Sequence, residues 1–350
     1  MQTTRATSAF PADALRSIFP DMTSRPTLRV FMLGATGTIG RATVRALVRH
    51  GHEVVCFGRP RRDASNARAT AERGVSVRVG DISDPASIAR DGFKGEHFDA
   101  VVSCMASRTG TPRDAWAVDH RAHMHVLEAA KAAGVPHMVL LSAICVQKPL
   151  LAFQEAKLAF ERALMDSGLT WSIVRPTAFF KSLSGQVERV KRGKPFLIFG
   201  DGTLTACKPI SDDDLAEFIA SCLEDPARQN RVLPIGGPGE AQTPRQQGEQ
   251  LFALLGREPR FKQVPVALLD TIIRVLTLLG RVIPPLADKA QLARIGRYYA
   301  TESMLVWDAE HARYDADATP STGHDTLTEF FAKRLRGDAH DDRGEHAVFT

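Results

Sequence analysis

A short apolar run that leads directly into three evenly spaced glycines constrains the fold of this chain more than any other feature. Residues 28–33 read LRVFML, which suits a buried parallel strand, and Gly34, Gly37 and Gly40 follow at the start of a helical pattern that ends near His50. In a strand–loop–helix unit of this kind, the first glycine permits a tight turn, the second lets the backbone approach a pyrophosphate and the third allows close helix packing. The sequence therefore predicts a dinucleotide-binding loop with a helix N-terminus facing the phosphates.

The GxxGxxG spacing of this loop is similar to that of the extended and atypical short-chain dehydrogenase/reductases. We expect the loop to contact the cofactor through Gly34, Thr36, Gly37, Thr38, Ile39 and Gly40. Further apolar runs suited to parallel strands alternate with helical stretches, at residues 54–57, 75–79, 100–104, 138–142 and 173–175. The predicted fold class is α/β: a Rossmann-type doubly wound parallel sheet with a smaller, mostly helical C-terminal substrate-binding domain.

The predicted domains follow this pattern. They are a flexible N-terminal extension (1–27), a nucleotide-binding Rossmann domain (28–177, with 205–237 returning to it), a substrate-binding portion (178–204 and 238–336) and a flexible tail (337–350). The extension lacks the apolar core of a signal peptide, and a short transit peptide is the alternative. In the returning segment, Ser211 is expected to cap a helix, with the acidic residues 212–214 serving the cap and packing rather than a metal.

Composition limits the partners of the chain. Its 350 residues carry a formal charge of +5. The fractions of hydrophobic residues (44%) and charged residues (24%) are typical of globular proteins. The sequence lacks the blocks of Lys and Arg with interleaved aromatics that nucleic-acid binding favours. Its five cysteines are dispersed without CxxC spacing, which indicates reduced thiols rather than a disulfide framework or a zinc site. We therefore expect no nucleic-acid partner and no metal site.

Arginines follow the second predicted strand, where an NAD-specific site usually has an acidic residue for the ribose 2′-hydroxyl. The stretch after that strand contains Arg59, Arg61 and Arg62 and no carboxylate. Guanidinium groups bind a 2′-phosphate through two parallel hydrogen bonds, so the sequence favours NADPH over NADH. Arg59 is the first candidate, with Arg62 or Arg61 next and Arg41 as a further candidate.

Residues at the ends of the other strands complete the predicted cofactor site. In the short-chain family, a residue at the position of Asp81 accepts from the adenine amino group, and Ile82 would lie beside the ring. The same resemblance places Ser103, Cys104, Met105, Ser142, Ala143, Pro176 and Thr177 along the ribose and nicotinamide.

The chain departs from the short-chain pattern at its reaction centre. Where that family carries Tyr-x-x-x-Lys, this sequence has Phe153 and Lys157, which share one helix face at i and i+4. Lys157 can still bind the nicotinamide ribose. A ketone reductase needs a positioned acid for the substrate oxygen, and the absent phenol argues against that chemistry. Reduction of a conjugated double bond has less need of such an acid.

Longer motifs closely resemble the NADPH-dependent divinyl chlorophyllide 8-vinyl reductases of chlorophyll and bacteriochlorophyll synthesis. The resemblance rests on LLSAICVQKPLLAFQEAKLAFE (140–161), RPTAFFK (175–181), GKP (193–195) to DG (201–202), and YDADATPSTG (314–323). It implies that hydride from NADPH reduces the 8-vinyl group of a magnesium tetrapyrrole to ethyl. Charge would then be delocalised over the macrocycle, and a carbon is protonated.

The proton source and the substrate contacts are open at this point. Candidate proton donors are Cys145, Ser142, Lys157 and water, and candidate substrate residues are Phe153, Phe179, Phe180 and Lys181. A phenol such as Tyr298 or Tyr299 poised over the cofactor for an oxygen substrate would contradict the proposed chemistry.

Residues 264–284 form an apolar helical stretch with one narrow polar stripe. The stripe comprises Asp270, Arg274, Thr277 and Arg281, and Pro265 suits a first helical turn. These charges argue against a transmembrane span. Three interpretations are open: a core helix, a wall of a flat apolar pocket, or a helix lying on a membrane surface. We expect a bacterial cytoplasm with peripheral membrane contact, and a plastid is the alternative.

Two other functions fit the same fold. One is a non-catalytic NADP-binding redox sensor or assembly factor, which the missing tyrosine would suit. The other is an enone or isoflavone-type reductase with a smaller substrate. Retention of Lys157 and the long segment 240–336 favour the vinyl reductase over the sensor.

Overall fold

The computed structural model describes residues 26–59 and 74–338, and its centre is a sheet of seven parallel strands. In sheet order the strands are β3 (Val75–Val79), β2 (Glu53–Gly58), β1 (Arg29–Leu33), β4 (Ala100–Ser103), β5 (His137–Leu141), β6 (Thr170–Pro176) and β8 (Arg231–Ile235). Every neighbouring pair is parallel. This strand order confirms the predicted doubly wound Rossmann sheet.

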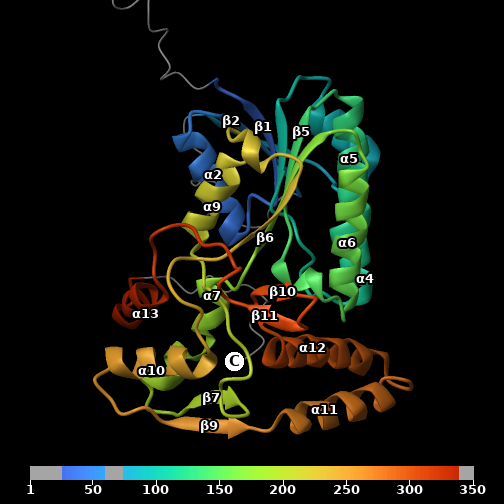
Figure 1. Cartoon of the computed structure of the whole chain (residues 1–350). Helices are drawn as coiled ribbons and strands as arrows, with labels where there is room; N and C mark the ends of the chain where they lie inside the picture. Colours follow the sequence, from blue (N-terminus) through green and yellow to red (C-terminus); the bar gives the residue numbers. More distant parts are fainter. Residues whose placement is uncertain (1–25, 60–73, 339–350) are drawn as a thin grey trace, which may run out of the picture.

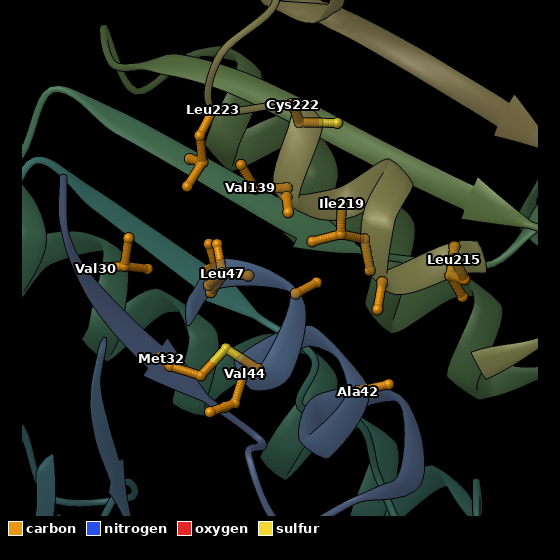
Figure 2. Packing of buried hydrophobic residues seen from close by; sticks show 14 of the residues in the cluster. Val30, Met32, Ala42, Val44, Leu47, Val139, Leu215, Ile219, Cys222 and Leu223 are labelled. Atoms are coloured by element: carbon orange, nitrogen blue, oxygen red, sulfur yellow. The ribbon is translucent and has the colours of Figure 1, made fainter. Parts of the chain in front are cut away.

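Helices cover both faces of the sheet (Figure 1). On one face lie α2 (Thr38–Arg49) and α9 (Asp212–Ser221), and on the other lie α5 (His123–Ala132) and α6 (Ala152–Met165). Leu47 of α2 and Ile219 of α9 are fully buried together against β1 and β5 (Figure 2). This shared core holds α9 against α2 and the sheet.

Short helical turns connect the main elements. They are α3 (Pro85–Ser87), η2 (Ile88–Phe93), α4 (Pro112–Ala115), η3 (Trp116–Ala122), η4 (Ile144–Gln147), α7 (Phe180–Leu183), η5 (Ser184–Gln186), α8 (Val187–Lys191) and η6 (Pro226–Arg228). The C-terminal portion contains β7 (Phe196–Phe199), α10 (Pro244–Leu254), β9 (Phe261–Val264), α11 (Val266–Leu279), α12 (Pro284–Thr301), β10 (Val306–Asp308), β11 (Arg313–Asp315) and α13 (Leu327–Arg336).

The C-terminal portion lies beyond the carboxyl ends of the strands (Figure 1). It is mostly helical, as predicted, but β7 and β9 pair in parallel to form a small second sheet that the sequence did not reveal. The cap of α9 is confirmed, because the Ser211 hydroxyl accepts from the Asp214 amide at 2.9 Å. The Asp214 carboxylate in turn accepts from the amides of His324 and Asp325. The acidic residues 212–214 therefore serve the N-cap of α9 and its packing against the segment around His324.

The core interpretation of the stretch 264–284 is wrong, because none of the residues of α11 is buried. Its polar residues face the protein: Asp270 pairs with Arg297 of α12, and the Thr277 hydroxyl accepts from Arg294 at 2.9 Å. Five of its apolar side chains are exposed: Leu268, Ile272, Val275, Leu278 and Leu279. The helix packs along α12, which separates it from the nucleotide-binding half (Figure 1).

Candidate active site

The carboxyl ends of the parallel strands bring the predicted cofactor residues to one edge. Strand order reverses between β1 and β4, and open α/β sheets bind ligands at such a switch point. Gly34 follows β1, Arg59 follows β2, Asp81 follows β3 and Cys104 follows β4. Ser142 and Thr177 follow β5 and β6 in the same way.

The glycine loop has the shape of a phosphate cradle. A Cβ on Gly34, whose φ is +73°, would lie 2.5 Å from the Cys104 carbonyl carbon. A Cβ on Gly40 would lie 2.0 Å from the Gly34 carbonyl oxygen. Gly37 is different. The nearest atom to a Cβ at this position would be the Gly34 carbonyl oxygen, at a van der Waals distance of 3.6 Å. Gly37 is also the N-cap of α2 and offers the helix no side-chain cap, so the space at the first turn is available to a pyrophosphate.

The adenosine end of the site is built around Asp81. Its carboxylate accepts from the amide and the hydroxyl of Ser83, at 2.9 and 2.7 Å. These hydrogen bonds, and the nearby charge of Arg59, lower the pKa of Asp81. The carboxylate is therefore ionised, and its contact with an adenine amino group stays a prediction. Arg61 and Arg62 lie outside the described residues, and Arg41 donates to the Thr36 carbonyl oxygen at 2.8 Å.

Replacing Arg59 tests the choice of cofactor. We expect Arg59→Ala to weaken NADPH binding about 10-fold, because an exposed charge-assisted hydrogen bond to a 2′-phosphate contributes about 1–1.5 kcal/mol. NADH lacks this phosphate, so its dissociation constant should not change. Fluorescence titration with both cofactors measures the difference. An equal effect on both would show that Arg59 does not bind the 2′-phosphate.

Lys157 of α6 is held by a carboxylate that the sequence reading missed. Its ammonium lies 3.0 Å from the carboxylate of Asp119, which is fully buried. Asp119 also accepts from the Ser107 amide at 3.1 Å. Burial alone would raise the pKa of Asp119, but the charge of Lys157 and these hydrogen bonds lower it, so the pair is ionic. Asp119 lies on the π-helical stretch η3, a type of distortion that is frequent at functional sites.

A buried histidine supports the neighbouring strand end. His123 Nδ1 lies 2.8 Å from the Val118 carbonyl oxygen, which can only accept, so Nδ1 carries the proton. Burial lowers the pKa of His123 to about 4, so the ring is neutral and Nε2 accepts from the Ser103 hydroxyl at 2.9 Å. Ser103 is thereby oriented at the end of β4.

Acid is expected to destabilise the fold through such histidines. Burial also lowers the pKa of His137 to about 4, below the usual 6.5. The unfolded chain therefore binds more protons between these values, and stability is lost as the pH falls from about 6.5 towards 4. For each of the two histidines, the free energy of unfolding should fall by about 1–2 kcal/mol when the pH is lowered from about 7 to about 5. Urea unfolding at both values measures this loss, which His137→Gln should reduce; an unchanged slope in the variant would refute the assignment.

The loop after β5 is braced from two sides. The fully buried Gln154 donates to the Cys145 carbonyl oxygen at 3.0 Å and accepts from the Leu151 amide at 3.0 Å. Gln147 accepts from the Trp307 amide at 2.8 Å, and Lys148 pairs with Glu302 at 2.7 Å. These contacts connect η4 to the C-terminal portion and hold the strand end against α12.

The candidate proton donors in this loop are poorly accessible. Cys145 is 2% exposed, and burial raises the pKa of its thiol. A thiol so enclosed cannot reach a substrate carbon, and its prediction as a direct proton source is corrected. Ser142 is also buried, and its hydroxyl has no hydrogen-bond partner among the described residues. That hydroxyl remains available to the cofactor.

One of the predicted substrate residues is buried in a core, and another lies near the glycine loop. Phe180 is buried in the core of the C-terminal portion, where its ring contacts Phe330, so it cannot contact a substrate. Lys181 lies near Asp212, whose carboxyl interacts with Thr38 of the glycine loop. This places Lys181 on the phosphate side of the site. Phe153 is buried beside Cys145, and Phe179 is half-buried against the core under α9.

Comparison with known proteins agrees with this geometry. A family model described as NAD(P)H-binding matches residues 34–226. A divinyl chlorophyllide a 8-vinyl-reductase of Oryza sativa subsp. indica is 49% identical over 98% of this chain and 86% of its own length. The chain belongs to the divinyl chlorophyllide a 8-vinyl-reductase family. A second member, from Zea mays, is 50% identical over 91% of this chain and 82% of its own length. Both plant proteins are named as chloroplastic.

The fold of this 8-vinyl-reductase family member has solved counterparts. An NADPH-dependent quinone oxidoreductase of Escherichia coli, complexed with NADPH, matches with a TM-score of 0.62 at 19% identity, covering 87% of this chain and 99% of its own. That likeness concerns the fold alone. Within residues 26–59 and 74–338, no helix has the length and hydrophobicity needed to cross a bilayer. The same ranges contain no group of three His, Cys, Asp or Glu residues suited to a metal ion.

Proposed function

We propose that this protein reduces the 8-vinyl group of divinyl chlorophyllide, or of divinyl protochlorophyllide, to ethyl with NADPH. The observation that carries the proposal is the near 50% identity, over almost the whole chain, to proteins named for this reaction. The site supports it, because Lys157 is retained and positioned while Phe153 fills the place of the tyrosine. A buried phenyl ring cannot protonate a carbonyl oxygen, so a carbon acceptor fits this site better.

NADPH supplies the hydride in this proposal, and the chain positions it. The amides at the start of α2 and the open space at Gly37 suit the pyrophosphate. Lys157 would bind the nicotinamide ribose through its ammonium, whose direction is set by Asp119. The reaction is a hydride transfer between two bound molecules. Holding them at the right distance and orientation therefore accounts for much of the rate acceleration.

The decisive assay uses the purified full chain. Divinyl chlorophyllide a is incubated with NADPH, the Soret band is followed, and the product is analysed by mass for a gain of two hydrogens. We expect the band to shift and the 8-vinyl signal to disappear with NADPH and not without it. A chlorophyllide that already carries an 8-ethyl group is the matched control, and it should oxidise no NADPH.

The same assay separates the alternatives. Tight NADPH binding without oxidation by any tetrapyrrole or enone would favour a redox sensor or assembly factor. Oxidation by a small enone and not by the chlorophyllide would favour an enone or isoflavone-type reductase. Either result would overturn the vinyl reductase.

We also propose that α11 rests on a membrane surface. Leu268, Ile272, Val275 and Leu279 recur at helical spacing and are all exposed, while Asp270 and Thr277 on the opposite side bond to α12. A surface helix normally turns its apolar face inward, so this helix is inverted relative to its protein. The exposed Lys262 and Arg281, which lie just outside the two ends of α11, suit anionic headgroups, and for this reason we favour a lipid surface over a second copy of the chain. The compartment we propose is a bacterial cytoplasm, with a plastid as the alternative.

Vesicle flotation tests this contact. The full chain should float with vesicles that contain phosphatidylglycerol and remain below with neutral ones at about 0.15 M salt. Leu268→Ser combined with Leu279→Ser should abolish flotation without a loss of stability, because both side chains are exposed. Self-association without flotation, seen by light scattering, would instead make this face an interface between copies.

A further inference from the structure

A hollow in the C-terminal portion, outside the nucleotide-binding half, is lined mainly by cations. Its volume is about 620 Å³, and its lining comes from the end of α8, from α10 and from the loop that leads into β9. The lining contains one carboxylate, Glu258, and four basic residues: Lys191, Arg192, Arg257 and Arg260. Its buried residue, Phe252, belongs to the core around Phe331 and not to the cluster around Phe153. The hollow is therefore separate from the candidate active site.

Two of these cations have no partner in the part of the chain that the structure describes. The side chains of Arg192 and Arg260 are exposed and form no hydrogen bond or ion pair with any residue of 26–59 or 74–338. Within the same ranges, Glu258 pairs with neither of them. Like charges that gather without counter-ions repel one another, and a bound anion removes this repulsion.

The other two cations are fixed in place by the backbone. Arg257 Nη1 donates to the carbonyl oxygens of Val190 and Lys191, each at 3.2 Å, at the end of α8. A guanidinium carries five N–H groups, so three of them are left for a ligand. The Lys191 ammonium donates to the Leu335 carbonyl oxygen at 3.1 Å and keeps two N–H groups. Because these side chains are already held, an anion that binds them loses less side-chain entropy.

The donor set of the hollow suits a phosphate group. Three guanidinium groups and one ammonium line the same space, and a guanidinium binds phosphate oxygens through two parallel hydrogen bonds. A phosphate offers more acceptor oxygens than a carboxylate, so it can bond to several of these cations at once.

The place of the hollow in the chain indicates where such a phosphate comes from. Arg260 directly precedes β9, and Pro265 alone separates β9 from α11. β9 and α11 follow one another along the lower edge of the molecule in Figure 1, and Lys262 of β9 is exposed. A phospholipid presents its phosphate next to an apolar layer, which matches a basic hollow next to the exposed apolar residues of α11.

We propose that this hollow binds the phosphate of an acidic phospholipid headgroup. The proposal goes beyond vinyl reduction and rests on the proposed membrane contact of α11. The helix provides the apolar contact, and the hollow provides a polar contact at the same surface. Two separate contacts also fix how the protein is oriented on the bilayer, because neither alone prevents rotation about itself.

The test removes the two cations that have no partner. Arg192→Gln combined with Arg260→Gln should weaken binding of the full chain to phosphatidylglycerol vesicles about 30-fold, since each cation near an anionic surface contributes about 5-fold. The matched control, Lys94→Gln combined with Arg231→Gln, removes two exposed cations of the nucleotide-binding half and lowers the net charge equally. It should change binding by less than about 2-fold, because these charges are remote from the surface. Flotation over a series of lipid concentrations measures the affinity, and thermal unfolding should be unchanged in both variants.

A second titration uses inorganic phosphate alone and follows binding by calorimetry. We expect no saturable binding, because a free ion lacks the apolar contact and the many headgroups of a bilayer. Saturable binding that Arg192→Gln with Arg260→Gln removes, together with unchanged flotation, would make the hollow a site for free phosphate and overturn the lipid proposal.

Flotation also distinguishes the failure of this proposal from the failure of the α11 contact. If the arginine variant and the unmodified protein float equally well, the hollow is refuted and the α11 contact stands. If Leu268→Ser with Leu279→Ser still floats and the arginine variant does not, the hollow is supported and the α11 contact fails. If the unmodified protein does not float, both are overturned, and the proposed vinyl reduction is unaffected.

Discussion

Lys157→Met is expected to lower kcat for vinyl reduction by about 100-fold or more, because the ammonium that would hold the nicotinamide ribose is lost. The substitution also leaves the carboxylate of Asp119 buried without its cation. Removing one partner of a buried ion pair costs about 3–5 kcal/mol. Asp119 keeps its hydrogen bond from the Ser107 amide, and Lys157 is slightly exposed. We therefore expect the lower end of this range, a decrease of about 3 kcal/mol in the free energy of unfolding.

A double variant separates these two effects. In Lys157→Met with Asp119→Asn, no charge is left unpaired, so most of the stability should return while the activity does not. Urea unfolding and single-turnover reduction measure the two quantities. Lys131→Met on the neighbouring helix α5 removes an exposed lysine and should change neither. Recovery of turnover in the double variant would contradict the role of Lys157 in catalysis.

Gly40→Ala is expected to lower both the stability of the protein and its affinity for NADPH, whereas Gly37→Ala is expected to lower only the affinity. The new methyl group at residue 40 would lie 2.0 Å from the Gly34 carbonyl oxygen, and backbone cannot swing aside. We expect Gly40→Ala to lower the free energy of unfolding by about 2–3 kcal/mol. The affinity for NADPH should fall by more than about 100-fold, because α2 is displaced.

The methyl group at residue 37 makes only an ordinary contact at 3.6 Å, and the φ of −71° suits alanine. Stability should therefore be unchanged, while the methyl group occupies the phosphate cradle and weakens NADPH about 10-fold or more. Thermal unfolding and nicotinamide fluorescence measure the two effects. Unweakened NADPH binding by Gly37→Ala would place the pyrophosphate elsewhere.

The sheet, the glycine loop and Lys157 could be predicted because they depend on local pattern. Apolar runs of strand length define the strands, and the carboxyl end of each parallel strand lies at the same edge. Any residue directly after such a strand, such as Asp81 or Ser142, is therefore placed at the cofactor site without knowledge of distant contacts. The helical position of Lys157 follows equally from its spacing to Phe153 and Pro149.

The environment of those residues required the tertiary structure. Asp119 is 38 residues from Lys157 in sequence, and Tyr298, which donates to the Cys145 carbonyl oxygen, is 153 residues from Cys145. Lys181 turned out to lie on the phosphate side, and Phe180 in a core, because the path of the chain after β6 decides both.

By itself, then, the sequence determined the nucleotide-binding half and the family, since these reside in contiguous motifs whose structure is set by near neighbours. Only the tertiary structure decided which carboxylate holds the lysine, which side chains brace the loop after β5 and which residues of α11 are exposed. The physical reason is that burial, ion pairing and desolvation arise from contacts between segments far apart in the chain, and no local pattern encodes them.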